Sequence, residues 1–316
     1  MKFALVLLTA LHFGAALAQT YPAKPLKLVT PFPPGGSADV IARLTAQKLA
    51  ENLGQPVIVD NRAGAGGLVG NEYASKQPPD GYTLLLITGA YPVQAAMLKS
   101  MPFDPLADIA MVSMLTSYPF VVSVRTDSPL RSLGDLIAQA KANPGKLNYP
   151  SSGIGTVHHL TGELLNAMAG IDLTHVPFRG GASPLTEVLG GRVDVLFEAM
   201  TLSIGQIRSG KLRALAVTSK ERWKALPDVP TVDETLRGYE VTSFIGLGAS
   251  GGTPPPIIAR LNGEVRKVLD DQEARKRFVE LGGEPRATTP EEMRAWIERD
   301  IVKWRNVIAQ RNIERQ

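Results

Sequence analysis

The chain of 316 residues contains no cysteine, which excludes both a disulfide framework and a lipidated cysteine anchor. Its formal net charge is only +4, so we expect no nucleic-acid partner. Histidine is scarce, and the neighbours His158 and His159 point to different helix faces, so neither a metal site nor a cofactor is predicted. What remains is a globular composition, with 44% hydrophobic and 20% charged residues.

The first 18 residues have the pattern of a secretory signal peptide. Lys2 supplies a positive charge, residues 3–17 are apolar, and Ala16-Leu17-Ala18 forms a small-residue cleavage site. The apolar run is short for a membrane anchor, and no stop-transfer flank follows it. We therefore expect cleavage before Gln19. Export without cysteine favours a bacterial periplasm.

A proline and glycine turn at residues 31–37 organises the first half of the chain. Leu28 and Val29 predict a buried strand before it, and a helical apolar pattern follows it. A glycine turn that leads into a helix N-terminus can bind an anion, and a plain strand–helix connector is an equal alternative. The binding candidates in this turn are Pro34, Gly35, Gly36, Ser37 and, in the first helical turn, Asp39.

A second turn of the same kind covers residues 150–160. It combines small hydroxyl side chains and glycines before another helix, with Thr156 as the expected N-cap. Two such turns that face one cleft would hold both ends of a dicarboxylate. The candidates here are Ser151, Gly153, Gly155, Thr156 and His159. Either His158 or His159 can line the cleft, although a position on the helix surface is the simpler prediction for a histidine here.

Four more candidates follow other predicted strands. Thr88 and Tyr91 come after the strand at 82–87, at the carboxyl edge where ligands bind. Arg179 can pair with a carboxylate or cap a helix end, and these two roles are about equally supported. Glu198 ends the strand at 193–198.

Strands alternate with helices along the chain, which predicts an α/β fold with parallel sheets. Residues 111–115 and 119–124 are two strand-like runs, and the second begins at Pro119. The apolar stripe of the last predicted helix, from about Pro290 to Ala309, indicates packing rather than a binding site.

Catalytic motifs fail on inspection, and no catalytic residue is predicted. Residues 248–252 match G-x-S-x-G around Ser250, but three prolines follow and no histidine lies beyond His175, so an exported hydrolase is a minor alternative. The glycines at 64–67 do not fit a dinucleotide fingerprint, because the third glycine would fall on Val69.

Taken together, the motifs resemble the Bug (Bordetella uptake gene) family, the TctC-like substrate-binding proteins of tripartite tricarboxylate transporters. The match covers nearly the whole mature chain in order. It consists of residues 31–39 (PFPPGGSAD), 60–67 (DNRAGAGG), 79–84 (PDGYTL), 151–160 (SSGIGTVHHL), 176–180 (VPFRG), 190–194 (GGRVD), 210–217 (GKLRALAV), 227–231 (PDVPT) and 252–254 (GTP).

The resemblance implies a two-lobed, type II-like periplasmic-binding-protein fold, each lobe a mostly parallel sheet flanked by helices, with a hinge that closes on the ligand. Lobe 1 is expected at 19–122 plus 245–316 and lobe 2 at 123–244. The implied ligand is a small carboxylate: a di- or tricarboxylate, an amino acid or an aromatic acid. The implied partners are membrane permease subunits, and we expect a monomer. A periplasmic sensor that signals to a receptor is the alternative.

Overall fold

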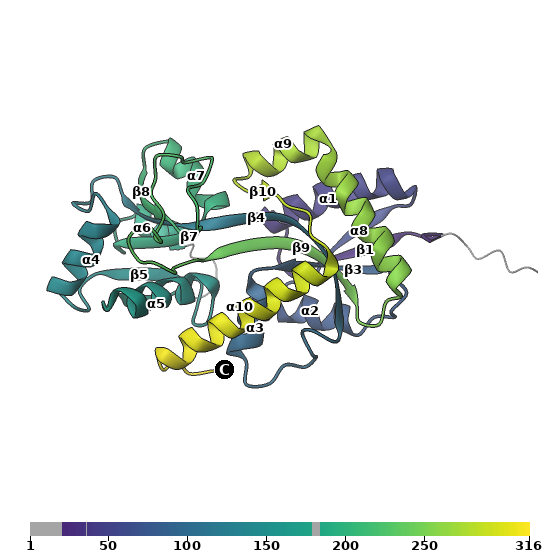
Figure 1. Ribbon diagram of the computed structural model, residues 1–316, viewed down its shortest axis with the longest axis horizontal. Helices are drawn as coiled ribbons and strands as arrows, with labels where there is room; N and C mark the ends of the chain where they lie inside the picture. The colour runs from purple at the N-terminus through teal and green to yellow at the C-terminus, as the bar shows by residue number, and fades with distance from the viewer. Residues whose placement is uncertain (1–20, 36, 179–183) are drawn as a thin grey trace, which may run out of the picture.

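The structure of the chain is a computed structural model that describes residues 21–35, 37–178 and 184–316. The predicted signal peptide, Gly36 and Arg179 lie outside these described residues. No helix within the described ranges is both long and apolar enough to cross a membrane. Two lobes lie side by side along the longest axis of the molecule, which confirms the predicted two-lobed α/β fold (Figure 1).

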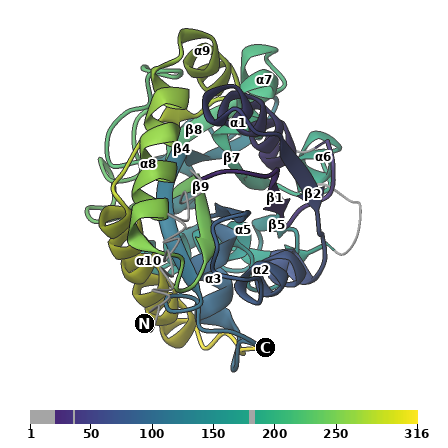
Figure 2. The same ribbon diagram turned by 90° about the vertical axis from the view of Figure 1, so that its right-hand side faces the viewer.

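Lobe 1 is built on three parallel strands, with β1 between β2 and β3. The helices at residues 37–53 and 255–270 cover one face of the sheet (Figure 2). The helices at residues 68–75 and 90–97 cover the opposite face together with the C-terminal helix. The elements of this lobe are β1 (Leu26–Thr30), α1 (Ser37–Leu53), β2 (Val57–Asn61), a 3-10 turn (Ala65–Gly67), α2 (Leu68–Ser75), β3 (Thr83–Thr88), α3 (Ala90–Met97), α8 (Pro255–Asp270), α9 (Gln272–Glu280) and β10 (Glu284–Pro285).

Lobe 2 contains a parallel pair, β5 and β6, and two further strands that pair with a long strand shared between the lobes. Its elements are α4 (Leu133–Ala142), β5 (Asn148–Ser151), α5 (Val157–Ala169), β6 (Thr174–Pro177), α6 (Pro184–Leu189), β7 (Val195–Ala199), α7 (Met200–Arg208) and β8 (Leu212–Val217).

Two long antiparallel strands, β4 (Ile109–Arg125) and β9 (Thr242–Ser250), connect the lobes (Figure 1). The two predicted runs at 111–115 and 119–124 are therefore a single strand that passes through Pro119. Proline is tolerated there because β4 changes partners at this point: it pairs with β9 up to Pro119 and with β7 from Phe120 onward.

The sheets are mixed rather than mostly parallel, which corrects the expectation. The order in the large sheet is β10-β4-β9-β3-β1-β2, and β9 is antiparallel to both β3 and β4. The reason is the crossing between lobes, since a strand that returns from lobe 2 runs opposite to the strand that leads there.

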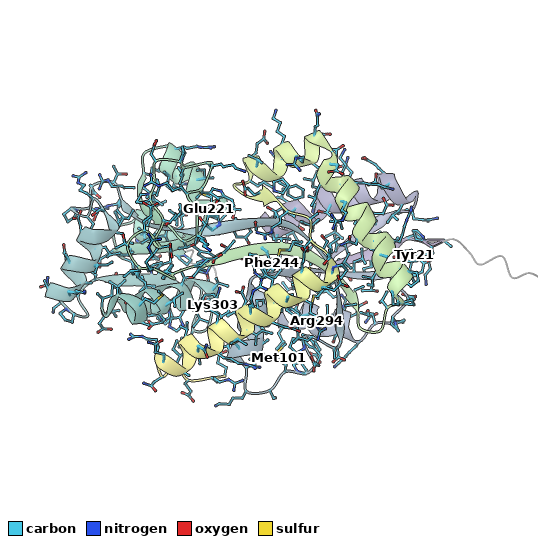
Figure 3. The ribbon with its side chains drawn as sticks, viewed as in Figure 1. Tyr21, Met101, Glu221, Phe244, Arg294 and Lys303 are labelled. Atoms are coloured by element: carbon cyan, nitrogen blue, oxygen red, sulfur yellow. The ribbon has the colours of Figure 1, made fainter. Side chains whose placement is uncertain are left out.

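The C-terminal helix α10 (Pro290–Gln310) spans both lobes on one side of the molecule (Figure 1). Its predicted apolar stripe packs as expected: Met293 joins the lobe 1 cluster with Phe244, which lies near the centre of the molecule (Figure 3). Further along, Trp304 joins the lobe 2 cluster with Tyr149. Thus α10 is a third link between the lobes, in addition to β4 and β9.

We predict that Gly162→Ala in α5 destabilises lobe 2. A Cβ atom at this position would collide with the ring of Tyr149, whose hydroxyl is held by a 2.7 Å hydrogen bond to Oε1 of Glu163. Overpacking of this kind should lower the free energy of unfolding by about 1–3 kcal/mol, as measured by urea denaturation.

The matched control is Gly263→Ala in α8, where no neighbouring atom lies within 4 Å of the added Cβ. This change should be neutral or stabilising by up to about 1 kcal/mol, because alanine favours helix more than glycine does. Equal effects of the two substitutions would contradict the packing argument.

Candidate functional site

A cleft of about 710 Å³ lies between the two lobes. Phe32, Pro33 and Ala38 line it from the first turn and the start of α1. Residues 152–157 of the second turn line it from lobe 2. The two glycine turns therefore share one cleft, which is the arrangement that the two-turn hypothesis requires.

Asp39, at the start of α1, accepts hydrogen bonds from other groups of the protein. Its Oδ2 accepts the N–H of Gly35 (3.0 Å) and a hydrogen bond from Nε of Arg43 (2.9 Å), and its Oδ1 accepts one from Nδ2 of Asn61 (3.0 Å). The pKa of Asp39 is lowered to about 2. The hydrogen bond from Arg43 contributes most to this shift, burial opposes it, and the hydrogen bonds from Asn61 and Gly35 add to it. Asp39 is therefore an anion that fixes the turn, and it already uses the Gly35 N–H that we expected a ligand to use.

Pro34 and Gly35 are exposed and are not among the residues that line the cleft. The helix α1 begins at Ser37, as expected from the sequence.

In the second turn, Gly153, Gly155 and Thr156 line the cleft. Thr156 is the predicted N-cap of α5, and its Oγ1 donates to the carbonyl of Gly153 (2.8 Å). Ser151 is buried behind the turn rather than in the cleft. Its Oγ accepts the N–H of Gly153 (3.0 Å) and lies 2.6 Å from Nε2 of His175.

His159 also lies behind the second turn, where it lines a separate cavity of about 640 Å³. Its Nδ1 accepts the N–H of Gly155 (3.0 Å), and its ring stacks on His175 at 3.9 Å between centroids. Burial lowers the pKa of His159, while the nearby Glu163 opposes this shift. Burial and then the neighbouring imidazole lower the pKa of His175 to about 4. The sequence placed His159 at the ligand, but here it positions the turn.

After β3, Thr88 lines the cleft, and its Oγ1 accepts the N–H of Ala90 (3.3 Å). Tyr91 does not reach the cleft, which corrects the prediction. The helix α3 begins at once after the strand, so Tyr91 turns into the core, where it packs near Phe103 and donates to the carbonyl of Pro105 (2.9 Å).

Glu198 lines the cleft and is almost fully buried, with 2% of its surface exposed. Its Oε1 lies 2.9 Å from Nε2 of His158 and accepts the N–H of Ala199 (2.8 Å). Burial alone would lower the pKa of His158, but the charge of Glu198 and its hydrogen bond outweigh this and raise it. The result is a buried ion pair in the wall of the cleft.

The sequence-based selection missed His158 and the residues that the crossing strands contribute, Tyr118, Phe120 and Ser243. The signal for His158 was the adjacent histidine pair, because neighbouring helical residues face different sides. The contribution of β4 would have been found by treating residues 109–125 as one strand.

Several helix N-termini face the cleft. Among the described residues, Ala38 of α1, Leu68 of α2, Ala90 of α3 and Val157 of α5 line it, and so does Ala199, which precedes α7. A helix N-terminus carries a partial positive charge. The N–H groups of Gly89, Ala90 and Ala199 already donate to the carbonyl of Phe244, to Oγ1 of Thr88 and to Oε1 of Glu198. Ser250 of the G-x-S-x-G match lies elsewhere. It is buried, and its Oγ donates to the carbonyl of Ala74 (3.0 Å).

Comparisons with a family model and with known relatives point to the same family. A family model described as "Tripartite tricarboxylate transporter family receptor" matches residues 41–313. Protein BugT of Bordetella pertussis is 38% identical over 296 residues, which cover 92% of this chain and 90% of that protein.

Solved structures agree with this match. Rpa4515 of R. palustris, determined with adipate, is 34% identical with a TM-score of 0.83, covering 93% of this chain and 99% of that chain. MatC (Rpa3494) from Rhodopseudomonas palustris, with bound malate, is 31% identical with a TM-score of 0.80, covering 91% of this chain and 100% of that chain. The resemblance carried by the sequence motifs is thereby confirmed, and the chain belongs to the tripartite tricarboxylate transporter receptors, the TctC and Bug family of periplasmic solute-binding proteins.

Proposed function

We propose that this protein captures a small carboxylate between its lobes and delivers it to the membrane permease subunits of a tripartite transporter. The observation that carries the proposal is that both glycine turns line one cleft on which helix N-termini converge. The structures of Rpa4515 with adipate and MatC with malate support a carboxylate ligand. We further propose export by the predicted signal peptide, action as a monomer, and no enzymatic activity.

The anion is held by helix N-termini and hydroxyl groups rather than by the glycine amides of the turns. The N–H groups of Gly35 and Gly155 already donate to Asp39 and His159. Thr88 lines the cleft beside the start of α3, and its Oγ1, which accepts the N–H of Ala90, can donate its own hydrogen to a ligand. The hydroxyl of Thr156, at the start of α5, already donates to the carbonyl of Gly153. A carboxylate at these termini gains both hydrogen bonds and a favourable dipole interaction.

The predicted site residues then divide by role. We assign ligand contact to the candidates in the cleft wall: Thr88, Gly153, Gly155 and Thr156. We assign positioning of the turns to Asp39, Ser151 and His159. Gly36, Ser37 and Arg179 stay predicted ligand contacts.

The lobes close by bending at the crossing strands, and the ligand stabilises the closed form that the permease recognises. We place the hinge where β4 changes partners beside the start of β9, and we keep lobe limits of 19–122 plus 245–316 and 123–244. Where the lobes meet, Met97 of α3 packs against Gly155 of the second turn.

The mature protein, residues 19–316, should show a raised melting temperature with one or more members of a carboxylate panel, because a ligand that binds only the folded state stabilises it. Isothermal titration should then give saturable, one-to-one binding. If no mono-, di- or tricarboxylate at millimolar concentration stabilised the protein while sugars or amines did, carboxylate capture would be wrong.

We predict that Gly155→Ala weakens ligand binding roughly tenfold, which corresponds to about 1.4 kcal/mol. Gly155 has φ +74°, and an added Cβ would lie 2.6 Å from Cγ of Met97, so the side chain is both strained and in collision with lobe 1. The measurement is the dissociation constant of the stabilising carboxylate by titration calorimetry.

Two further variants separate strain from collision. Gly153→Ala introduces strain at φ +131° without a contact shorter than 4.0 Å, and it should cost less affinity. Adding Met97→Ala to Gly155→Ala should recover part of the affinity relative to the sum of the single changes. Strict additivity would show that contact between the lobes at Gly155 is unimportant for closure.

We also predict that stability and carboxylate affinity fall as pH rises above about 6.5, the ordinary pKa of histidine. The pKa of His158 is raised in the folded protein, so its contribution is fully present below the unfolded pKa and is lost as pH passes the folded one. Above that pH the charge of Glu198 stands uncompensated in the cleft. Affinity should drop by at most about tenfold per pH unit for one linked proton.

His158→Gln is the control for this dependence and should flatten the alkaline side of both profiles. Tyr118 of β4, another titratable side chain that lines the cleft, stays neutral in this range because burial raises its pKa. An unchanged profile in His158→Gln would assign the dependence to another group.

A further inference from the structure

The side chains of the cleft wall also indicate the chemistry of the part of the ligand that is not its carboxylate. The apolar side chains in that wall come from both lobes and from the crossing strands. They include Phe32, Met97, Phe120, Leu202 and Ile245. A volume of about 710 Å³ is in the range of small-molecule sites and leaves room for a ring-sized body. These surfaces favour a ligand whose middle is apolar, because a polar body would lose its hydration without new partners.

The charged side chains among the described lining residues are those of Glu198 and His158, and Oε1 of the first lies 2.9 Å from Nε2 of the second. The N–H of Ala199, at the start of α7, also donates to Oε1 of Glu198. Glu198 therefore occupies the α7 N-terminus as an internal anion. A ligand carboxylate is more stable at the other termini, those of α3 in lobe 1 and α5 in lobe 2.

Both hydrogen bonds that the described residues make with Glu198 end at Oε1. Its second oxygen, Oε2, takes part in no hydrogen bond with the described residues and is left as an acceptor. A hydroxyl group can donate to that atom. An ionised second carboxylate on the ligand has no hydrogen to donate there, so two acceptors would face each other in a site of low dielectric constant, which is unfavourable.

We propose that Glu198 and His158 select the ligand, and that this ligand is a monocarboxylic acid with an apolar body and a neutral hydroxyl donor at its far end. The inference rests on the proposed function, since it names which carboxylates the site accepts. A ligand ammonium group is disfavoured, because His158 already supplies one positive charge to Glu198. Di- and tricarboxylic acids are disfavoured because an ionised carboxylate has no hydrogen to donate to Oε2 of Glu198.

The test compares acids that differ only at the far end. One set has a six-carbon chain: 6-hydroxyhexanoate, hexanoate, adipate and 6-aminohexanoate. The other has a benzene ring: 4-hydroxybenzoate, benzoate and terephthalate. Titration calorimetry of the mature protein should show, in at least one set, the hydroxy acid binding tenfold or more tighter than the diacid, with the plain acid between them.

Two variants should change this preference in opposite directions. Glu198→Gln removes the charge while keeping an acceptor, so the diacid should gain at least fivefold relative to the hydroxy acid. His158→Gln leaves Glu198 charged and unneutralised, so the diacid should lose further. If Glu198→Gln does not fold, the same contrast is measured in the unaltered protein, where the preference for the hydroxy acid should grow as pH rises and His158 loses its proton.

The outcomes distinguish failure of this inference from failure of the proposed carboxylate capture. Tightest binding of adipate, terephthalate or 6-aminohexanoate would overturn the inference and leave carboxylate capture intact. Binding of malate or citrate with no response to either set would do the same. Absence of binding by any carboxylate would overturn both.

Discussion

The glycine turns of the two lobes are fixed by the same kind of hydrogen bond. Each lobe has a turn that contains a glycine with positive φ, Gly35 at +90° and Gly155 at +74°. Each of these glycines donates its N–H to the side chain four residues later, to the carboxylate of Asp39 and to the imidazole of His159. The acceptor differs, but the geometry repeats, and the rest of the cleft depends on it. A turn fixed by the protein itself is rigid before a ligand arrives, so little ordering entropy remains to be lost on binding.

The local pieces of the site could be predicted from the sequence, because a glycine turn before a helix has a clear signature. Thr156 is an N-cap, Asp39 lies in the first turn of α1, and both turns reach one cleft. The features that the sequence did not reveal depend on pairing between strands that are far apart in the chain. Residues 111–115 and 119–124 were predicted as two strands, but β4 continues through Pro119, which lacks an N–H, because the strand exchanges partners at that residue.

The roles of individual side chains were the least predictable part, since they depend on the direction in which a helix faces. Tyr91 follows the strand edge in the sequence, but the immediate start of α3 turns it into the core. His159 was selected and His158 was not, although His158 lines the cleft. Periodicity places the two rings on different faces of α5, but it does not say which face meets the ligand.

The adjacent rings of His158 and His159 have a practical consequence. One stands in the wall of the cleft with its pKa raised, and the other stands behind the second turn with its pKa lowered. Their ring proton resonances in an NMR titration therefore serve as two internal reporters on a single helix. The resonances of His158 respond to ligand in the cleft, and those of His159 respond to changes in the second turn. Binding of the ligand and loosening of the turn can therefore be measured separately in one sample.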